Sequence, residues 1–243
     1  MFIKFFRYLL KGYLSKNKNN VDKVIVIYSH GWHSEGSKDI GRMGSSLLYN
    51  EGYDILVIDH EAHGNSLGSY TTFGINDSNN IYLWVKKINE IYNGNCKIIL
   101  MGMSMGANAI LLLASKKMEN VKMIIADCGF TSLFEEMKYS FVHRLKLGVF
   151  RFFEFYLFCL INMNINMKEK DARITLKSSK YPVLLIHGRC DEVVPVSMSK
   201  ENYRLCRSKK ELLIIDNARH ALSSVENKEE YNNRVKRFVR ENL

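Results

Sequence analysis

Short apolar runs recur along this chain, and most are followed by a stretch of mixed polar and apolar residues long enough for a helix. Such runs are typical of strands buried on both faces, as in a parallel sheet covered by helices. We therefore predict an α/β fold, with a mostly parallel sheet and helices on both faces. The predicted strands are residues 8–14, 24–28, 54–58, 97–102, 121–126, 182–187 and 211–216. The predicted helices are residues 38–51, 77–92, 105–117, parts of 133–163, 197–207 and 226–241.

One apolar run, Ile98 to Met101, leads directly into Gly102-Met103-Ser104-Met105-Gly106. This G-x-S-x-G spacing is that of a nucleophile elbow, in which a serine sits on a strained turn between a strand and a helix. Glycines two residues before and after the serine let neighbouring backbone pass close to it. Mostly apolar residues follow up to Ala114, as expected for a buried helix. Ser104 is therefore the predicted nucleophile, and the alternative is a structural turn that happens to contain a serine.

A serine hydroxyl is a poor nucleophile at neutral pH, so this hypothesis requires a histidine as general base and a carboxylate that orients the histidine. Asp191 and His220 each follow a predicted strand, and both are therefore expected at the carboxyl edge of the sheet. We predict that Asp191 is the orienting acid and that His220 is the base. The rival acids are Asp127, Asp171 and Asp216.

The other histidines are weaker candidates for the base. His30 and His187 precede glycines at strand ends, where ring packing or a loop hydrogen bond is the expected role. His33, His60 and His143 have no second ligand at the spacing of a metal site, and no Cys-x-x-Cys or His-x-x-x-His pair occurs. The sequence therefore predicts neither a metal site nor a cofactor.

The hypothesis also requires two backbone N–H groups that stabilise the substrate's carbonyl oxygen as it becomes negatively charged. Met105 is expected to supply one, because it directly follows the nucleophile. Trp32 is expected to supply the other, because it lies in the loop after the predicted strand 24–28. Trp32 and Phe130 are the expected substrate-binding residues. The alternative for Trp32 is an aromatic of the core or the rim.

Several motifs, in the expected order, resemble the α/β-hydrolase superfamily over nearly the whole chain. His30-Gly31-Trp32 is similar to its oxyanion motif, and Asp59 to Gly68 is similar to its D-x-R-G-H-G-x-S-x-G loop. The elbow and the loops around Asp191 and His220 match as well. The chain looks most like small bacterial hydrolases described as BEM46-like or prolyl-oligopeptidase-like. Glu61 stands where the family has arginine, so no role of that arginine carries over, and the resemblance implies a structural turn at His63.

The resemblance implies antiparallel strands before the strand 24–28, and residues 8–14 are the favoured candidate. This aromatic and basic amino-terminal segment is too short and too charged for a signal peptide or a membrane span. The alternative is an amphipathic segment that lies on a membrane surface. In either case we expect an abbreviated amino-terminal sheet, with little room for the family's usual first strand.

A segment rich in large apolar residues lies between the predicted strands 121–126 and 182–187. Arg151 and Glu154 exclude a continuous membrane helix there. In the family's fold a helical cap occupies this position and covers the serine. We predict one domain over residues 1–243, with a cap insertion at about 133–176. Its apolar residues favour an acyl or aryl substrate, or alternatively serve only to pack the cap on the body.

Composition and charge limit the classes of function that this chain can have. The hydrophobic share of 47% argues against disorder. Five cysteines without regular spacing indicate reduced thiols in the cytoplasm. The net charge of +10 allows weak peripheral contact with an anionic membrane. No nucleic-acid motif accompanies the basic residues, so we expect no nucleic-acid partner.

The predicted function is a serine hydrolase that cleaves carboxylic esters of apolar acyl or aryl substrates through an acyl-enzyme. Its partner is a small-molecule ester, and its oligomeric state is not predicted. One alternative is a peptidase or amidase of the prolyl-oligopeptidase type, which uses the same triad. The other alternative is a ligand-binding protein of the same fold without catalysis.

Overall fold

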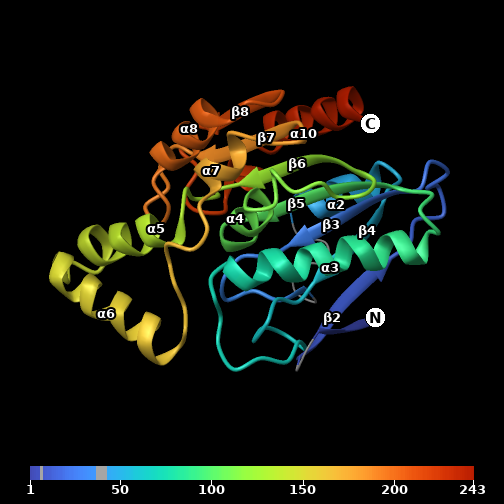
Figure 1. Cartoon of the computed structure of the whole chain (residues 1–243). Coiled ribbons are helices and arrows are strands. Elements are labelled where there is room, and N and C mark those ends of the chain that lie inside the picture. Colours follow the sequence, from blue (N-terminus) through green and yellow to red (C-terminus); the bar gives the residue numbers. More distant parts are fainter. Residues whose placement is uncertain (6–7, 37–42) are drawn as a thin grey trace.

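The computed structural model describes residues 1–5, 8–36 and 43–243, and its centre is an eight-stranded sheet (Figure 1). The strands lie in the order β1-β2-β4-β3-β5-β6-β7-β8. β1 and β2 pair antiparallel with their neighbours, and the strands from β4 to β8 pair in parallel. The strands are β1 (Phe2–Phe5), β2 (Tyr8–Ser15), β3 (Val24–Ser29), β4 (Asp54–Ile58), β5 (Lys97–Met103), β6 (Val121–Asp127), β7 (Val183–Gly188) and β8 (Lys210–Ile215).

Each predicted strand is present within one residue of its expected ends, and the predicted α/β fold with a mostly parallel sheet is confirmed. Residues 8–14 lie in the sheet, as favoured, and do not form a membrane-surface helix. The expectation of little room for a first strand is wrong, because the four residues of β1 pair with β2, Phe2 opposite Lys11. The Met1 ammonium donates to the Gly12 carbonyl at 2.6 Å and fixes the start of this hairpin.

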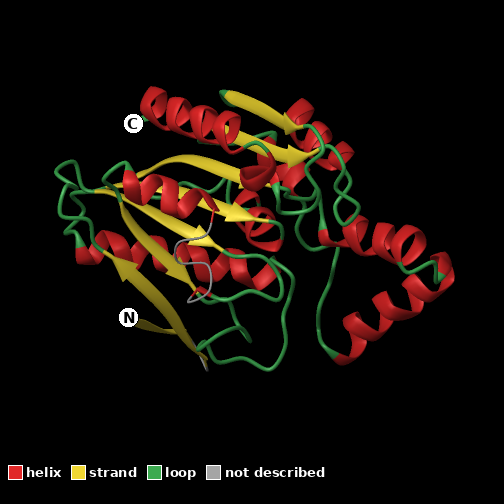
Figure 2. Ribbon diagram, turned by 180° about the vertical axis from the view of Figure 1, so that it is seen from behind, coloured by secondary structure: helices red, strands yellow, loops and turns green. Residues whose placement is uncertain are grey.

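Helices cover both faces of the sheet, and alternating side chains of the strands explain why. In β3, Ile25 and Ile27 point into one core and Val26 and Tyr28 into the other. The first core is covered by α3 and α4 and the second by α2 and α10, which Figure 2 shows from behind. The helices of the body are α2 (Met43–Asn50), α3 (Ile75–Ile91), α4 (Met105–Leu111), α7 (Ala172–Leu176), α8 (Val196–Leu205), α9 (Ser223–Glu226) and α10 (Lys228–Asn242).

The helix predictions need two corrections. The helix expected over 105–117 ends at Leu111, because the N–H groups of Leu113 and Ala114 bond three residues back and form tight turns. The short helices α7 and α9 were not predicted, and α9 is separate from α10. Of the helix expected over 38–51, residues 38–42 lie outside the described part of the chain.

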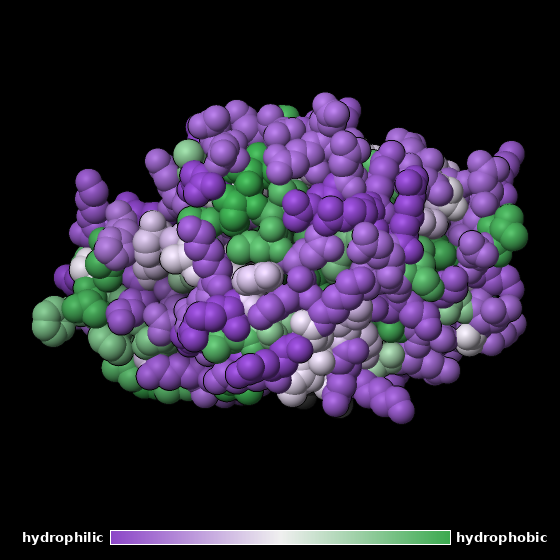
Figure 3. Space-filling model, turned by 90° about the horizontal axis from the view of Figure 1, so that it is seen from above, coloured by the Kyte–Doolittle hydropathy of each residue, from purple (hydrophilic) through white to green (hydrophobic). Residues whose placement is uncertain are grey.

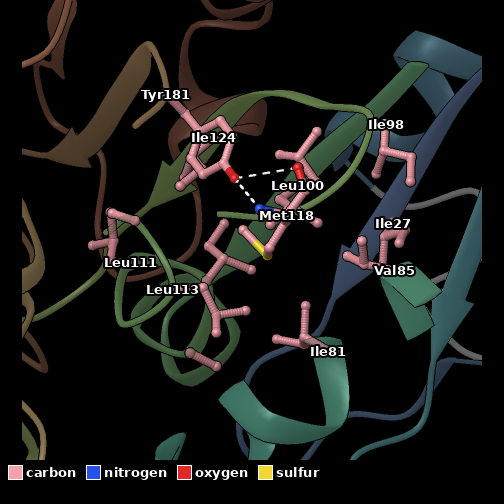
Figure 4. Packing of buried hydrophobic residues seen from close by; sticks show 14 of the residues in the cluster. Ile27, Ile81, Val85, Ile98, Leu100, Leu111, Leu113, Met118, Ile124 and Tyr181 are labelled. Atoms are coloured by element: carbon pink, nitrogen blue, oxygen red, sulfur yellow. Dashed lines mark hydrogen bonds between the residues drawn. The ribbon is translucent and has the colours of Figure 1, made fainter. Parts of the chain in front are cut away.

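The connection after α4 is held in place by contacts in the first core (Figure 4). Ile27, Leu100 and Ile124, from three adjacent strands, are fully buried there. The Tyr181 hydroxyl accepts the Met118 N–H at 2.6 Å and donates to the Lys116 carbonyl at 2.8 Å. The first of these bonds gives the buried Met118 N–H a partner, which no helix or strand provides.

Three elements between β6 and β7 form a cap at one end of the molecule (Figures 1 and 2). They are α5 (Leu133–Tyr139), a π-helical turn η1 (Ser140–Arg144) and α6 (Gly148–Asn162). Ser132 caps α5 by accepting the Glu135 N–H. Phe152 and Cys159 of α6 are buried in a third apolar cluster with Phe130. The inner side of the cap thereby packs on the loops at the carboxyl edge of the sheet.

Candidate active site

Ser104 lies on a sharp turn between β5 and α4, with φ 53° and ψ −117°. This strained conformation lifts its side chain from the end of the strand. A Cβ on Gly102 would lie 2.7 Å from the Gly106 carbonyl oxygen, and a Cβ on Gly106 would lie 2.2 Å from the Ser29 carbonyl oxygen. Both glycines are therefore sterically required at the elbow, as its spacing predicts.

The structure brings Ser104, His220 and Asp191 together in one hydrogen-bonded chain. Ser104 Oγ lies 2.9 Å from His220 Nε2, and His220 Nδ1 lies 2.7 Å from Asp191 Oδ2. Because an ionised carboxylate only accepts, His220 carries its proton on Nδ1 and leaves Nε2 free to accept the serine proton. The three residues follow β5, β8 and β7, whose carboxyl ends meet at one edge of the sheet.

The carboxylate of Asp191 is buried and held at both of its oxygens. Oδ1 accepts the N–H groups of Val193 and Val194 at 2.8 and 2.9 Å. Oδ2 lies near His220 and also 3.2 Å from His187 Nε2. Burial alone would raise the pKa of Asp191, but the hydrogen bonds from the two histidines hold it well below its usual range. Asp191 is thus kept ionised beside His220.

His187 is a contact of the site that the sequence analysis missed. Its ring is fully buried, with Nδ1 at 2.7 Å from Ser199 Oγ and Nε2 at 2.9 Å from the Val194 carbonyl oxygen. A packing or loop role was expected for it, and those bonds are present. Its contact with Asp191 comes in addition, and the spacing of four residues between His187 and Asp191 at a strand end is the sequence signal that could have indicated it.

The rival acids have other partners. Asp127 Oδ1 accepts the Ser223 hydroxyl at 3.1 Å, and burial raises the pKa of Asp127 to about 6. Asp171 caps α7 and pairs with Arg173. Asp216 is exposed and pairs with Arg189. In the described structure, Asp191 therefore fits the orienting role best.

A cavity of about 640 Å³ opens beside Ser104. Its volume suits a small-molecule ligand, and its surface is mostly apolar. The predicted residues Trp32, Met105 and Phe130 all line it. Gly31 brings the loop of Trp32 against the nucleophile, because a Cβ on Gly31 would lie 3.5 Å from the Ser104 Cβ. The cap closes the cavity with Met137, Ser140, Phe141, Arg144, Leu145 and Phe155.

Polar groups of the cap also face this cavity, and the sequence analysis missed them. Glu136 is buried, and its Oε1 accepts the Ser140 hydroxyl at 2.9 Å. Arg144 Nη1 donates to the same hydroxyl at 3.2 Å. Burial raises the pKa of Glu136. Their spacing of four residues places the three side chains on one side of the segment, which is a signal that a helical pattern could have supplied.

A second Ser-His-Asp set lies beneath the Trp32 loop. Ser29 Oγ is 2.8 Å from His60 Nε2, and His60 Nδ1 is 3.1 Å from Asp77 Oδ1. All three residues are at most 1% exposed, so a substrate cannot reach them. They tie the ends of β3 and β4 to α3, which makes this set a structural support of the site.

One group of side chains has the composition of a metal site. Single ligand atoms of Cys128, Asp191 and His220 lie within 4.8 Å of one another. Burial, followed by the nearby Asp127 and Asp191, raises the pKa of the Cys128 thiol well above its usual value. The thiol is therefore protonated, and Asp191 and His220 are bonded to each other, so this arrangement suits proton transfer better than metal binding.

Comparison with known proteins agrees with this fold. A family model described as alpha/beta hydrolase fold matches residues 24–158, which is more than half of the chain, and the chain belongs to this family. The uncharacterized protein YqkD of Bacillus subtilis is 27% identical over 234 residues, which are 96% of this chain and 75% of YqkD. The structure of the esterase Pf2001 of Pyrococcus furiosus is similar with a TM-score of 0.76 and 26% identity, covering 97% of this chain and 88% of the esterase.

The lysophosphatidylserine lipase ABHD12 of Danio rerio is 26% identical over 195 residues. The match covers 77% of this chain and 48% of the lipase, so the chain spans about half the length of that relative. The family, the esterase and the lipase together support a hydrolase.

Proposed function

We propose that the protein is a serine hydrolase that cleaves carboxylic esters of apolar acyl or aryl substrates. The observation that carries this proposal is the continuous hydrogen-bonded chain from Ser104 through His220 to Asp191, which opens into a mostly apolar cavity. The sequence motifs predict the same three residues for the nucleophile, the base and the orienting acid.

In the first half of the reaction, Ser104 Oγ attacks the ester carbonyl carbon while His220 Nε2 takes the serine proton. The tetrahedral intermediate collapses when His220 returns this proton to the leaving alkoxide, which departs as the alcohol. In the second half, His220 takes a proton from water while the water oxygen attacks the acyl carbon, and His220 returns this proton to Ser104 Oγ as the carboxylic acid leaves. Asp191 stays ionised throughout and stabilises the imidazolium, in accord with its low pKa.

We assign the oxyanion donors to the backbone N–H groups of Trp32 and Met105. Both residues line the cavity at Ser104, and the approach of Gly31 to Ser104 supports the assignment of Trp32. An N–H group that bonds to the substrate's carbonyl oxygen only as negative charge develops on this oxygen lowers the activation barrier, typically by about 3 kcal/mol. Trp32 and Phe130 also form apolar walls for the acyl or aryl group.

The relatives favour esters and not amides. The similar structure from Pyrococcus furiosus is that of an esterase, and ABHD12 is a lysophosphatidylserine lipase. Among the described residues that line the cavity, Glu136 is the one acidic residue.

We place the activity in the cytoplasm. The unpaired cysteines support this location, and they are Cys96, Cys128, Cys159, Cys190 and Cys206.

The test is the value of kcat/KM on p-nitrophenyl esters of increasing acyl length, for the wild type beside Ser104→Ala. The proposal expects serine-dependent turnover with an optimum in acyl length, because the cavity is finite. Turnover that persists in Ser104→Ala would show that another group is the nucleophile. A folded wild type without ester turnover would refute the esterase.

A further inference from the structure

The cap helix α6 exposes a stripe of large apolar side chains. Phe150, Leu157 and Ile161 are 83%, 51% and 75% exposed, and their spacing of seven and four residues places them on one side of the helix. Phe153 and Phe158 flank this stripe and are about half exposed. We define the outer face of α6 as Phe150, Phe153, Leu157, Phe158 and Ile161.

The opposite side of α6 is already used for packing. Phe152 and Cys159 are buried in the third apolar cluster, and Phe155 lines the cavity. The outer face is therefore not needed for the fold, yet it keeps five large apolar side chains in water. Hydrophobic residues also gather at this end of the molecule in the space-filling view (Figure 3). Concentrated apolar exposure of this kind marks an interaction surface.

The same segment continues into the candidate active site. Arg144 and Leu145, just before α6, line the cavity with Ser104, and Leu145 is 56% exposed. After α6, the Met163 carbonyl accepts the Tyr70 hydroxyl at 2.9 Å. Trp32, at the cavity, is 53% exposed. The outer face thus belongs to the same cap segment that lines the cavity.

The charges around the outer face are mainly positive. Arg144, Lys146 and Arg151 are exposed, and the acidic residue between positions 140 and 163 is Glu154, which pairs with Arg151 at 2.7 Å. The whole chain carries a net charge of +10. Basic side chains beside an apolar helix face can extend toward lipid phosphates while the apolar side chains enter the bilayer boundary.

We propose that the outer face of α6 docks on the surface of an anionic lipid bilayer, with the helix parallel to the membrane plane. None of the helices among the described residues is long and apolar enough to cross a bilayer, so this contact is peripheral. Docking itself does not rest on the proposed esterase function. If that function holds as well, the cavity next to α6 takes its apolar esters from the bilayer.

A second copy of the chain fits this surface less well than a bilayer does. In a two-fold symmetric pair the same patch meets itself, so a surface that carries Arg144, Lys146 and Arg151 would face a surface with the same excess of positive charge. Glu154 already pairs with Arg151 and leaves no acidic partner in this segment for the other copy. An anionic bilayer instead offers phosphates to Arg144 and Lys146, because Arg151 is already paired with Glu154.

The test is co-flotation of the full chain with vesicles of phosphatidylcholine, with and without phosphatidylglycerol. Wild type is expected to float with the anionic vesicles and to be released by salt. The double variant Phe150→Gln/Ile161→Gln should partition about tenfold more weakly or worse, because two apolar side chains no longer enter the lipid. Ile174→Gln is the matched control, because Ile174 is a 68% exposed isoleucine of α7, outside the outer face.

Each outcome decides the proposal. Binding that is equal in wild type and in the double variant, with unchanged melting temperature, would overturn docking through α6, and so would a wild type that binds no vesicles. A wild-type dimer that the double variant converts to a monomer, without vesicle binding, would identify a second copy as the partner. Vesicle binding by a protein that hydrolyses no ester would support docking while refuting the proposed function.

Discussion

Asp191 Oδ2 lies 3.2 Å from His187 Nε2, so the carboxylate that bonds to His220 also holds a second, fully buried histidine. His187 is in turn fixed by Ser199 and by the Val194 carbonyl. The orientation of Asp191 toward His220 therefore depends on groups from β7, α8 and the loop between them. This relationship gives His187 a positioning role behind the proposed triad.

Replacing His187 with glutamine should loosen Asp191 and lower kcat by about tenfold with little change in KM, because His187 does not line the cavity. Steady-state kinetics on the folded variant measures kcat and KM separately. A purely structural role would instead lower the melting temperature and leave kcat of the folded protein unchanged.

Replacing Asp191 with asparagine should lower kcat/KM by about 10³-fold or more, because an amide cannot hold His220 in the tautomer that accepts the serine proton. Asp127→Asn is the matched control, because Asp127 is the other buried aspartate near the site and bonds to Ser223. Equal activity losses in the two variants would contradict the assignment of Asp191.

The same control variant should stabilise the protein at neutral pH. Burial raises the pKa of Asp127 to about 6 from a usual value of 3.8, so the folded state binds its proton more tightly than the unfolded state. The contribution of Asp127 to wild-type stability should therefore decrease as the pH rises from about 4 to about 6, by roughly 3 kcal/mol at most, and Asp127→Asn should lack this loss. Urea unfolding of both proteins at pH 4, 6 and 8 measures the difference, which should be smallest at pH 4.

Replacing Gly106 with alanine should prevent stable folding, with a loss of at least about 3 kcal/mol, because the new Cβ meets the Ser29 carbonyl at 2.2 Å. Gly31→Ala is the control, because its Cβ would meet its nearest neighbour at 3.5 Å, an ordinary contact. Urea unfolding compares the two, and a Gly106→Ala protein as stable as wild type would contradict the close packing of the elbow against β3.

Local patterns in the sequence predicted the strands from β2 to β8 and the residues Ser104, Asp191 and His220, because each of these residues lies within five positions after an apolar run. The contacts of His187 with Asp191, and of Glu136 with Ser140 at the cavity, were missed, although each pair has a spacing of four residues. This spacing alone does not predict the contacts, because they depend on how a loop and the cap fold over the end of the sheet. The strand β1 was missed because a four-residue hairpin strand carries little periodic signal.

The most direct test of the central claim is reaction with a fluorophosphonate, followed by mass spectrometry of the labelled peptides. The account predicts one adduct, on Ser104, with none on the buried Ser29, and much slower labelling of His220→Ala and Asp191→Asn. An adduct on another serine, or no adduct on the folded wild-type protein, would contradict an activated nucleophile at Ser104.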